Sequence, residues 1–256
     1  MSALVDFAYA QARIQARYGE RPQPQVWQQL DGVADFALYL EQARGTPLRP
    51  WVASLAPSTP VHELESRLRA VLRALIDEVA GWLPREWGPA VRWTAQLACL
   101  PVAQQLARGA EPRPWMRRDD SLAPWLSASP EGPDGRPAGP MARLRQAARQ
   151  EGGWLPDAWL AEWRGLWPLM DPGQRRSLER LAQLIRSHLL GFARMAPERA
   201  WELRRALQQT LQRWFRGAAF EAAAAFIYLA LVALDLERLR AALVGRALYP
   251  QGRFLS

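Results

Sequence analysis

The chain has 256 residues, a hydrophobic fraction of 49% and a formal net charge of +8 at pH 7. This length suits one large domain or two small ones and allows a core that needs no metal ion or disulfide for stability. One cysteine and two histidines exclude an internal disulfide and leave too few soft ligands for a zinc site with ordinary spacing.

All the positive side chains are arginines, because the chain contains no lysine, and asparagine is absent as well. This composition is typical of the codon bias of a GC-rich genome. The arginines are scattered among aspartates and glutamates along the chain, which indicates dispersed charge rather than one basic run. A net charge of this size is still compatible with an acidic partner, because it steers association.

Apolar residues recur at helical spacing through most of the chain, and no stretch alternates apolar and polar residues as a strand does. The sequence therefore predicts an all-α fold, either a multi-helix bundle or an array of helical hairpins. The first helix is expected over about 4–18, with Phe7, Ile14 and Tyr18 on one stripe. A second helix is expected over 26–43.

A Ser-Thr-Pro tripeptide at 58–60 is a helix start signal, with a hydroxyl side chain at the cap and proline at the first helical position. Glu63 follows in the first turn, where the helix dipole favours negative charge. The apolar spacing then predicts a long helix as far as Trp82. A further helix is expected over 90–107, and Pro101 should kink or restart it because proline lacks a backbone donor.

Proline and glycine dominate residues 110–153 and are densest over 130–140. Such a composition does not bury enough apolar surface to offset the entropy of ordering, so this segment is predicted to be a linker or loop with a mobile centre. It separates an N-terminal helical region, 1–109, from a C-terminal helical region, 154–256. Helices of the C-terminal region are expected over 176–195, 198–215 and 220–248.

The C-terminal region contains two unusual apolar segments. Residues 222–234 form an uncharged run of 13 residues, which is shorter than the ~20 needed to cross a bilayer and so predicts a helix buried on all sides. Trp154, Trp159, Trp163 and Trp167 form a cluster at helical spacing. Because tryptophan is usually well buried, the core is the favoured location, and a partner interface is the alternative.

No residue pattern predicts catalysis. The phosphate-binding loop, the dinucleotide-binding turn and the nucleophile elbow are all missing, so we expect no enzyme, no catalytic residue, no cofactor and no metal. Cys99 is interpreted as a core residue, His62 as exposed and His188 as part of a helix interface. The acidic pair at 119–120 directly follows an arginine pair at 117–118, so we expect these four side chains to be exposed and mutually paired.

The first twenty residues include Asp6, Arg13 and Arg17 and lack a continuous apolar run. The sequence therefore predicts no secretion signal. We also expect no transmembrane segment and a cytoplasmic location.

Two segments at opposite ends of the chain resemble one protein family. Residues 6–14 read DFAYAQARI, and residues 226–246 read FIYLALVALDLERLRAALVGR. Together they resemble the two ends of the funnel-shaped central-stalk protein of V/A-type rotary ATPases, which is designated C in these enzymes and d in eukaryotes. The match covers roughly 6–109 and resumes over about 203–250.

This resemblance implies an all-helical, roughly three-lobed funnel that sits on the cytoplasmic face of the membrane rotor ring and holds the central shaft. It implies a non-catalytic role, with the rotor-ring proteolipid and the shaft subunits as partners, and a peripheral position on the inner membrane. The chain is shorter than typical members, and its predicted linker stands where the family has a further lobe. It is therefore interpreted as a shortened or divergent member of the family.

Under this interpretation, five arginines are candidates for the partner interface, because guanidinium groups pair well with carboxylates. They are Arg13, Arg17, Arg238, Arg240 and Arg246. The competing interpretation is that each of them pairs locally on its own helix. Two other functions stay open: a cytoplasmic helical adaptor or regulatory protein with a related fold, and, ranked third, nucleic-acid binding through arginine-rich helices.

Overall fold

The computed structural model describes residues 3–127, 138–150, 154–196, 199–218 and 221–249, and the regular elements in these ranges are all helical. The predicted all-α fold is therefore confirmed. None of the described helices has both the length and the apolar character that a membrane crossing requires. The predicted mobile centre of the linker falls largely on 128–137, outside the described residues.

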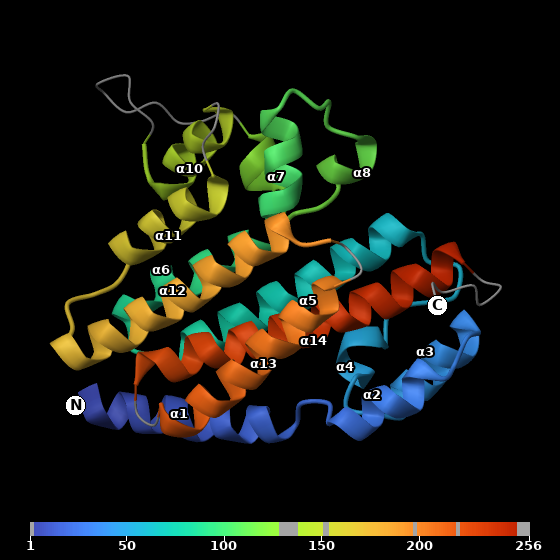
Figure 1. The fold of residues 1–256 in the computed structure, drawn as a ribbon, viewed down its shortest axis with the longest axis horizontal. Coiled ribbons are helices and arrows are strands. Elements are labelled where there is room, and N and C mark those ends of the chain that lie inside the picture. The colour runs from blue at the N-terminus through green and yellow to red at the C-terminus, as the bar shows by residue number, and fades with distance from the viewer. Residues whose placement is uncertain (1–2, 128–137, 151–153, 197–198, 219–220, 250–256) are drawn as a thin grey trace.

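The helices in chain order are α1 (Ala3–Gly19), α2 (Pro24–Asp31), α3 (Phe36–Arg44), α4 (Arg49–Val52), α5 (Val61–Trp82), the 3₁₀ helix η1 (Arg85–Trp87), α6 (Gly88–Trp93), the 3₁₀ helix η2 (Thr94–Cys99), α7 (Leu100–Ala107), α8 (Pro114–Arg117), α9 (Ala123–Leu126), α10 (Pro140–Arg149), α11 (Leu155–Gly165), α12 (Pro172–Arg194), α13 (Ala200–Gly217) and α14 (Ala222–Leu248). Figure 1 shows α5 and α14 running along each other through the middle of the molecule, and α1 contacts both. Helices α12 and α13 pack on α14. Helices α7, α10 and α11 lie together on one side, and α2 and α3 lie at the end where α14 finishes (Figure 1).

Helix α14 is deeply buried because its first half is apolar on every side. All residues from Ala222 to Leu229 are buried, and α1, α5, α12 and α13 contact the helix. This confirms the prediction of a helix covered on all sides for 222–229, whereas Ala230, Ala233 and Leu234 in the rest of the predicted run are half-buried. The small side chains of Ala222–Ala225 let the neighbouring helices approach closely at interior packing density.

The prediction of a single helix over 26–43 is wrong, because the chain forms two helices, α2 and α3, with a break at residues 32–35. The cause is local capping. The carboxylate of Asp35 accepts a hydrogen bond from the backbone N–H of Leu38 at 2.7 Å and so starts α3. An N-cap aspartate satisfies a donor at the helix start that would otherwise lack a partner.

Helix α5 begins one residue later than the start signal indicates. Pro60 has an extended backbone and is itself the N-cap, and no side chain caps the helix. The Thr59 hydroxyl instead accepts a hydrogen bond from the backbone N–H of Ala56 at 2.9 Å. The hydroxyl therefore stabilises the preceding turn, whereas Glu63 lies in the first turn of α5 as expected.

Pro101 restarts the helix that was expected over 90–107. The chain passes from α6 through η2 into α7, and Pro101 lies in the first turn of α7. Just after α7 comes Gly109, which has a φ of 89°. The backbone N–H of Gly109 donates to the carbonyl of Leu106 at 3.1 Å, and that of Ala110 donates to the carbonyl of Gln105 at 3.2 Å. This is a helix termination that a left-handed glycine permits.

The segment 110–153, expected to be a linker, contains packed structure on both sides of 128–137. Before residue 128, Met116, Leu122 and Trp125 are buried. After residue 137, α10 packs against α7 and α11. Proline occupies the first turn of α8, α9 and α10, where its missing N–H carries no cost, so a proline-rich composition is compatible with short helices here.

A chain of aromatic rings connects the N- and C-terminal regions. Phe7 of α1 contacts Trp87 edge to face, with ring centroids 6.3 Å apart, and Trp87 lies 6.2 Å from Phe226 of α14. Phe226 lies 5.0 Å from Trp163 of α11, which stacks on Trp159 at 5.6 Å. Trp159 and Trp163 are fully buried, so these two members of the tryptophan cluster are core residues. The described parts of the two regions share one hydrophobic core.

Candidate partner-binding surface

A buried ion pair joins the two ends of the chain. Nη2 of Arg21, just after α1, lies 2.7 Å from Oδ2 of Asp235 in α14, and Nε donates to the same oxygen at 2.8 Å. The exposed fractions of these side chains are 7% and 2%. The Arg21 guanidinium also donates to the carbonyl oxygen of Leu231 at 3.4 Å and lies 5.3 Å from the centroid of the Tyr18 ring. Helix α1, which contains residues 6–14, packs against α14, which contains residues 226–246, so the two segments that carry the family resemblance lie side by side.

Burial dominates the electrostatics of this pair. It raises the pKa of Asp235 to about 6, against the attraction and hydrogen bond of Arg21, which lower it. Ionised groups are costly to remove from water, so the two charges depend on their close contact. Loss of either partner would leave an uncompensated charge in the core. The pair therefore fixes α14 against the turn between α1 and α2.

Arg246, near the end of α14, is also buried and connects this helix to α2. Its Nε donates to the carbonyl oxygen of Val33 at 2.6 Å, and its Nη2 donates to those of Leu30 and Asp31 at 3.2 and 3.4 Å. Its guanidinium carbon lies 4.1 Å from the centroid of the Tyr39 ring. These carbonyls lie at the C-terminal end of α2, where the helix dipole favours a cation. Arg246 thus has a structural role as a cap for α2.

Arg13 and Arg17 lie one turn apart on α1 and have different surroundings. Arg17 forms ion pairs with Glu78 of α5 at 2.6 Å and with Glu20 at 2.9 Å. Arg13 is exposed, and its guanidinium carbon lies 5.3 Å from the centroid of the Trp82 ring. Among the five candidate arginines, Arg13 has no carboxylate within ion-pair distance in the part of the chain that the structure describes.

Arg238 and Arg240, near the middle of α14, both pair with carboxylates of other helices. Nη2 of Arg238 lies 2.8 Å from the carboxylate of Asp31 in α2. Nε of Arg240 donates to the carboxylate of Glu65 in α5 at 2.8 Å. The two side chains are about half exposed. Each of these arginines therefore links α14 to another helix through an ion pair and is also partly exposed to solvent.

Arg117, Arg118 and Asp120 are exposed as expected, but Asp119 is buried and pairs with Arg69, so the prediction of exposed, local pairing is wrong for Asp119. Its carboxylate accepts a hydrogen bond from Nε of Arg69 in α5 at 3.1 Å and another from the backbone N–H of Ser121 at 2.9 Å. Burial by itself raises the pKa of Asp119, but the hydrogen bonds from Ser121 and Arg69 outweigh it and hold the pKa below its usual value. The partner lies fifty residues away in sequence, which is why the local pattern misassigned it.

The cysteine and the two histidines lie where the sequence predicts. Cys99 is buried, its Sγ lies 3.4 Å from the carbonyl oxygen of Ser121, and burial raises the pKa of the thiol. His62 is exposed, whereas His188 is half-buried, and burial together with nearby Arg204 lowers the pKa of His188. Within the described ranges, no three His, Cys, Asp or Glu side chains come together as ligands for a metal ion.

Helices α12 and α13 concentrate positive charge in a way that the sequence analysis missed. They contain nine arginines and two glutamates, and so account for seven of the eight net positive charges of the chain. Charge counted over the whole sequence hides this surplus, whereas charge counted helix by helix reveals it. We call the outward side of these two helices the hairpin surface. Its exposed arginines are Arg175, Arg176, Arg180, Arg194, Arg205, Arg213 and Arg216.

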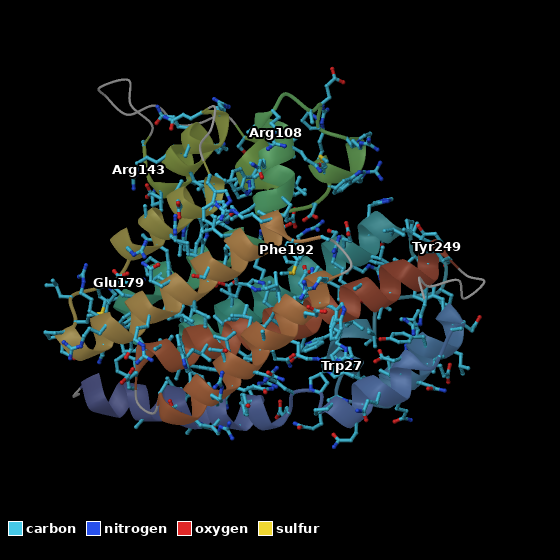
Figure 2. The ribbon with its side chains drawn as sticks, in the orientation of Figure 1. Trp27, Arg108, Arg143, Glu179, Phe192 and Tyr249 are labelled. Carbon is cyan, nitrogen blue, oxygen red and sulfur yellow. The ribbon has the colours of Figure 1, made fainter. Side chains whose placement is uncertain are left out.

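A shallow groove lies between the two helices on the hairpin surface. Its lining consists of Glu179, Arg180, Gln183, Leu184, Ser187 and Trp214. The guanidinium carbon of Arg180 lies 5.1 Å from the centroid of Trp214, and that of Arg204 lies 4.7 Å from the centroid of Phe192. Figure 2 shows Glu179 near the start of α12 and Phe192 near its end. Arg180, early in α12, thus contacts Trp214, late in α13, and Phe192, late in α12, contacts Arg204, early in α13. The two helices are therefore antiparallel.

Comparisons of the chain with protein-family models, with curated proteins and with solved structures gave no match.

Proposed function

We propose that the chain is a non-catalytic subunit of a V/A-type rotary ATPase or ATP synthase that links the central shaft to the membrane rotor ring. One observation carries this proposal: the two segments that resemble that family pair with each other. They are far apart in sequence, yet α1, which contains residues 6–14, packs against α14, which contains residues 226–246. Phe7 of the first segment and Phe226 of the second both contact the ring of Trp87, and the buried ion pair between Arg21 and Asp235 lies just beyond the first segment. Two segments that serve one function are expected to lie close together in the folded protein, even when they are far apart in sequence.

A linking subunit has to carry torque without bond chemistry, so its helices must resist sliding past one another. Helix α14 contacts α1, α5, α12 and α13. Directional bonds from Arg21 and Arg246 add to these apolar contacts. Because closely packed interiors transmit strain, this arrangement supports a mechanical role.

Arg13 is the candidate arginine best suited to contact a partner. Its charge is exposed and has no carboxylate partner among the described residues. An acidic surface on a neighbouring subunit would supply the missing carboxylate. Arg17, Arg238 and Arg240 already have intramolecular partners, which weaken their attraction for another chain.

Affinity purification of the tagged protein from its own gently solubilised membranes tests the proposal. Mass spectrometry should identify the ring proteolipid and a shaft subunit among the proteins that stay bound through a salt wash. The substitution Arg13→Glu should lower their recovery, because it replaces attraction to an acidic surface by repulsion.

The matched control is Arg108→Glu, since Arg108 is exposed at the end of α7 (Figure 2). It makes the same change of charge away from α1 and should leave recovery unchanged. Recovery of a soluble partner alone, or of none, would overturn the proposal and leave a helical adaptor as the better interpretation.

A further inference from the structure

The hairpin surface carries more positive charge than the described residues neutralise. Both glutamates of its two helices are already paired, Glu179 with Arg164 of α11 and Glu202 with Arg199. Two of the nine arginines pair with carboxylates of α11 and α14. The seven exposed arginines of the hairpin surface have no described carboxylate within ion-pair distance, so the surplus stays on the outside of the molecule.

Such a surplus opposes folding of the isolated hairpin. Arg176 and Arg180 lie one turn apart on α12, and Arg213 and Arg216 lie three residues apart on α13. Like charges at these spacings destabilise a helix. A partner that brings negative charge would relieve this repulsion and gain charge complementarity.

One of these arginines, Arg180, lines a groove with an apolar floor. Leu184 and Trp214 are half-buried in the groove, and Arg180 stacks on Trp214. Gln183 and Ser187 continue the α12 side of the groove and carry no charge. An apolar groove between two helices with a charged rim is the geometry that receives an amphipathic helix.

We infer that the hairpin surface binds an acidic amphipathic helix of a partner protein. The apolar face of that helix covers Leu184 and Trp214, and its carboxylates pair with the guanidinium groups of Arg180 on α12 and Arg213 on α13. Because Arg180 is already held against Trp214, it loses less side-chain freedom on binding. The inference concerns a different surface from α1 and does not depend on the proposed rotary ATPase function.

The apolar floor distinguishes this partner from two other kinds of polyanion. A nucleic-acid backbone pairs with arginines but does not cover a recessed leucine and tryptophan. An anionic membrane binds helices whose apolar side chains project furthest outward. Leu184 and Trp214 lie instead between two helices and beside charged neighbours, which favours a narrow, protruding apolar ridge such as that of a helix.

Fluorescence anisotropy with three labelled synthetic helical peptides tests this inference on the full-length protein. The first peptide carries a leucine stripe flanked by glutamates, the second has glutamine for each glutamate, and the third has alanine for each leucine. The first should bind at least about tenfold more tightly than either of the others. The triple variant Arg176→Glu, Arg180→Glu, Arg213→Glu should lose that preference, because its rim repels the glutamates.

The matched control reverses three exposed arginines elsewhere, Arg108, Arg113 and Arg117, and should bind the first peptide as the unaltered protein does. Far-UV circular dichroism reports whether each variant is folded. Where charge reversal unfolds the hairpin, glutamine at the same three positions should produce the same loss of binding. Equal binding by both triple variants, no preference for the first peptide, or tighter binding to duplex DNA or phosphatidylglycerol vesicles would overturn the inference.

Discussion

The α1–α14 junction and the α12–α13 hairpin use the same residue type in opposite ways. At the junction, Arg21 and Arg246 are buried and bind Asp235 and backbone carbonyls. On the hairpin, Arg180 and Arg213 are exposed and have no described carboxylate partner. In a chain without lysine, arginine therefore has no single role: a buried guanidinium holds the fold together, and an exposed unpaired one is available to another molecule.

The difference follows from the chemistry of the guanidinium group. It stays protonated in proteins and carries five donors in a fixed plane. Burial is tolerated only where acceptors meet those donors, as they do around Arg246. On the hairpin, water solvates the same group, so its loss should cost the fold little.

The largest expected effect comes from removing the acidic partner at the junction. Asp235→Ala leaves the guanidinium of Arg21 buried without its counter-ion, which should lower the free energy of unfolding by about 3–5 kcal/mol. Urea denaturation followed by circular dichroism measures the change. Replacing both members with apolar residues, Arg21→Met and Asp235→Leu, should recover most of the loss, since neither variant side chain then carries a buried charge. A loss below about 1 kcal/mol for the single substitution would contradict the structural role of the pair.

The pH dependence of stability should separate the two buried aspartates. Folding raises the pKa of Asp235 to about 6, above the ~3.9 of an unfolded aspartate, so the folded state binds this proton more readily. The contribution of Asp235 is therefore largest below about pH 4 and is lost as the pH rises through its folded pKa. The stability of the unaltered protein relative to Asp235→Asn should fall between acidic and neutral pH.

Asp119 provides the opposite case, because its pKa is lowered in the folded protein. Its stabilising contribution is present above about pH 4 and is lost as the pH falls through the lowered pKa. Relative to Asp119→Asn, the unaltered protein should therefore lose stability on acidification. Urea denaturation over a series of pH values measures the stability of the unaltered protein relative to each variant. If both stability differences changed in the same direction with pH, the opposite pKa shifts given to Asp235 and Asp119 would be refuted.

A smaller effect on stability is expected when the planar guanidinium group of Arg246 at the junction is replaced by the ammonium group of lysine. Arg246→Lys keeps the cation but does not reach the carbonyls of Leu30 and Val33 together, so it should cost about 1–3 kcal/mol for the acceptors left unsatisfied. Arg205→Lys on the hairpin is the control and should change stability by less than about 0.5 kcal/mol. Thermal unfolding of the two variants measures this difference. Equal losses of stability would contradict the distinction between structural arginines at the junction and exposed arginines on the hairpin.

The smallest effect is expected for truncation at the hairpin. Arg180→Ala removes a cation–aromatic contact with Trp214, which is worth about 0.5–1 kcal/mol at an exposed site. Removal of a repelling charge offsets part of that loss. Urea denaturation should show a change near zero, and a loss above about 2 kcal/mol would mean that the arginine is part of the fold rather than of a binding surface.

Helical periodicity was enough to predict the fold class and the strongest individual helices. The apolar run of α14 and the amphipathic pattern of α5 depend on neighbouring residues alone, and both helices form where expected. The break between α2 and α3 was missed because the apolar stripe continues across it, although Asp35 is a recognisable cap residue. Short-range capping chemistry decided the boundary there, not periodicity.

The polar contacts of the core were beyond the reach of sequence reasoning. Arg21 and Asp235 meet only because α1 packs on α14, and Asp119 finds its donor in Arg69 of α5. No local pattern encodes such pairs. The hairpin surface differs, because its charge surplus was visible in the sequence once counted helix by helix, while its groove required the antiparallel packing of α12 and α13.

The cap that Arg246 places on α2 has a consequence for how the chain is made. Arg246 and Leu30 are separated by 216 positions, and Arg21 and Asp235 by 214. At a synthesis rate of about 5–20 residues per second, the first helices wait roughly 10–40 s on the ribosome before their counterparts emerge. During that interval α2 lacks its cap and Arg21 lacks its counter-ion. The contacts that Arg21 and α2 make with α14 therefore form only late in synthesis, after the helices between them have been made.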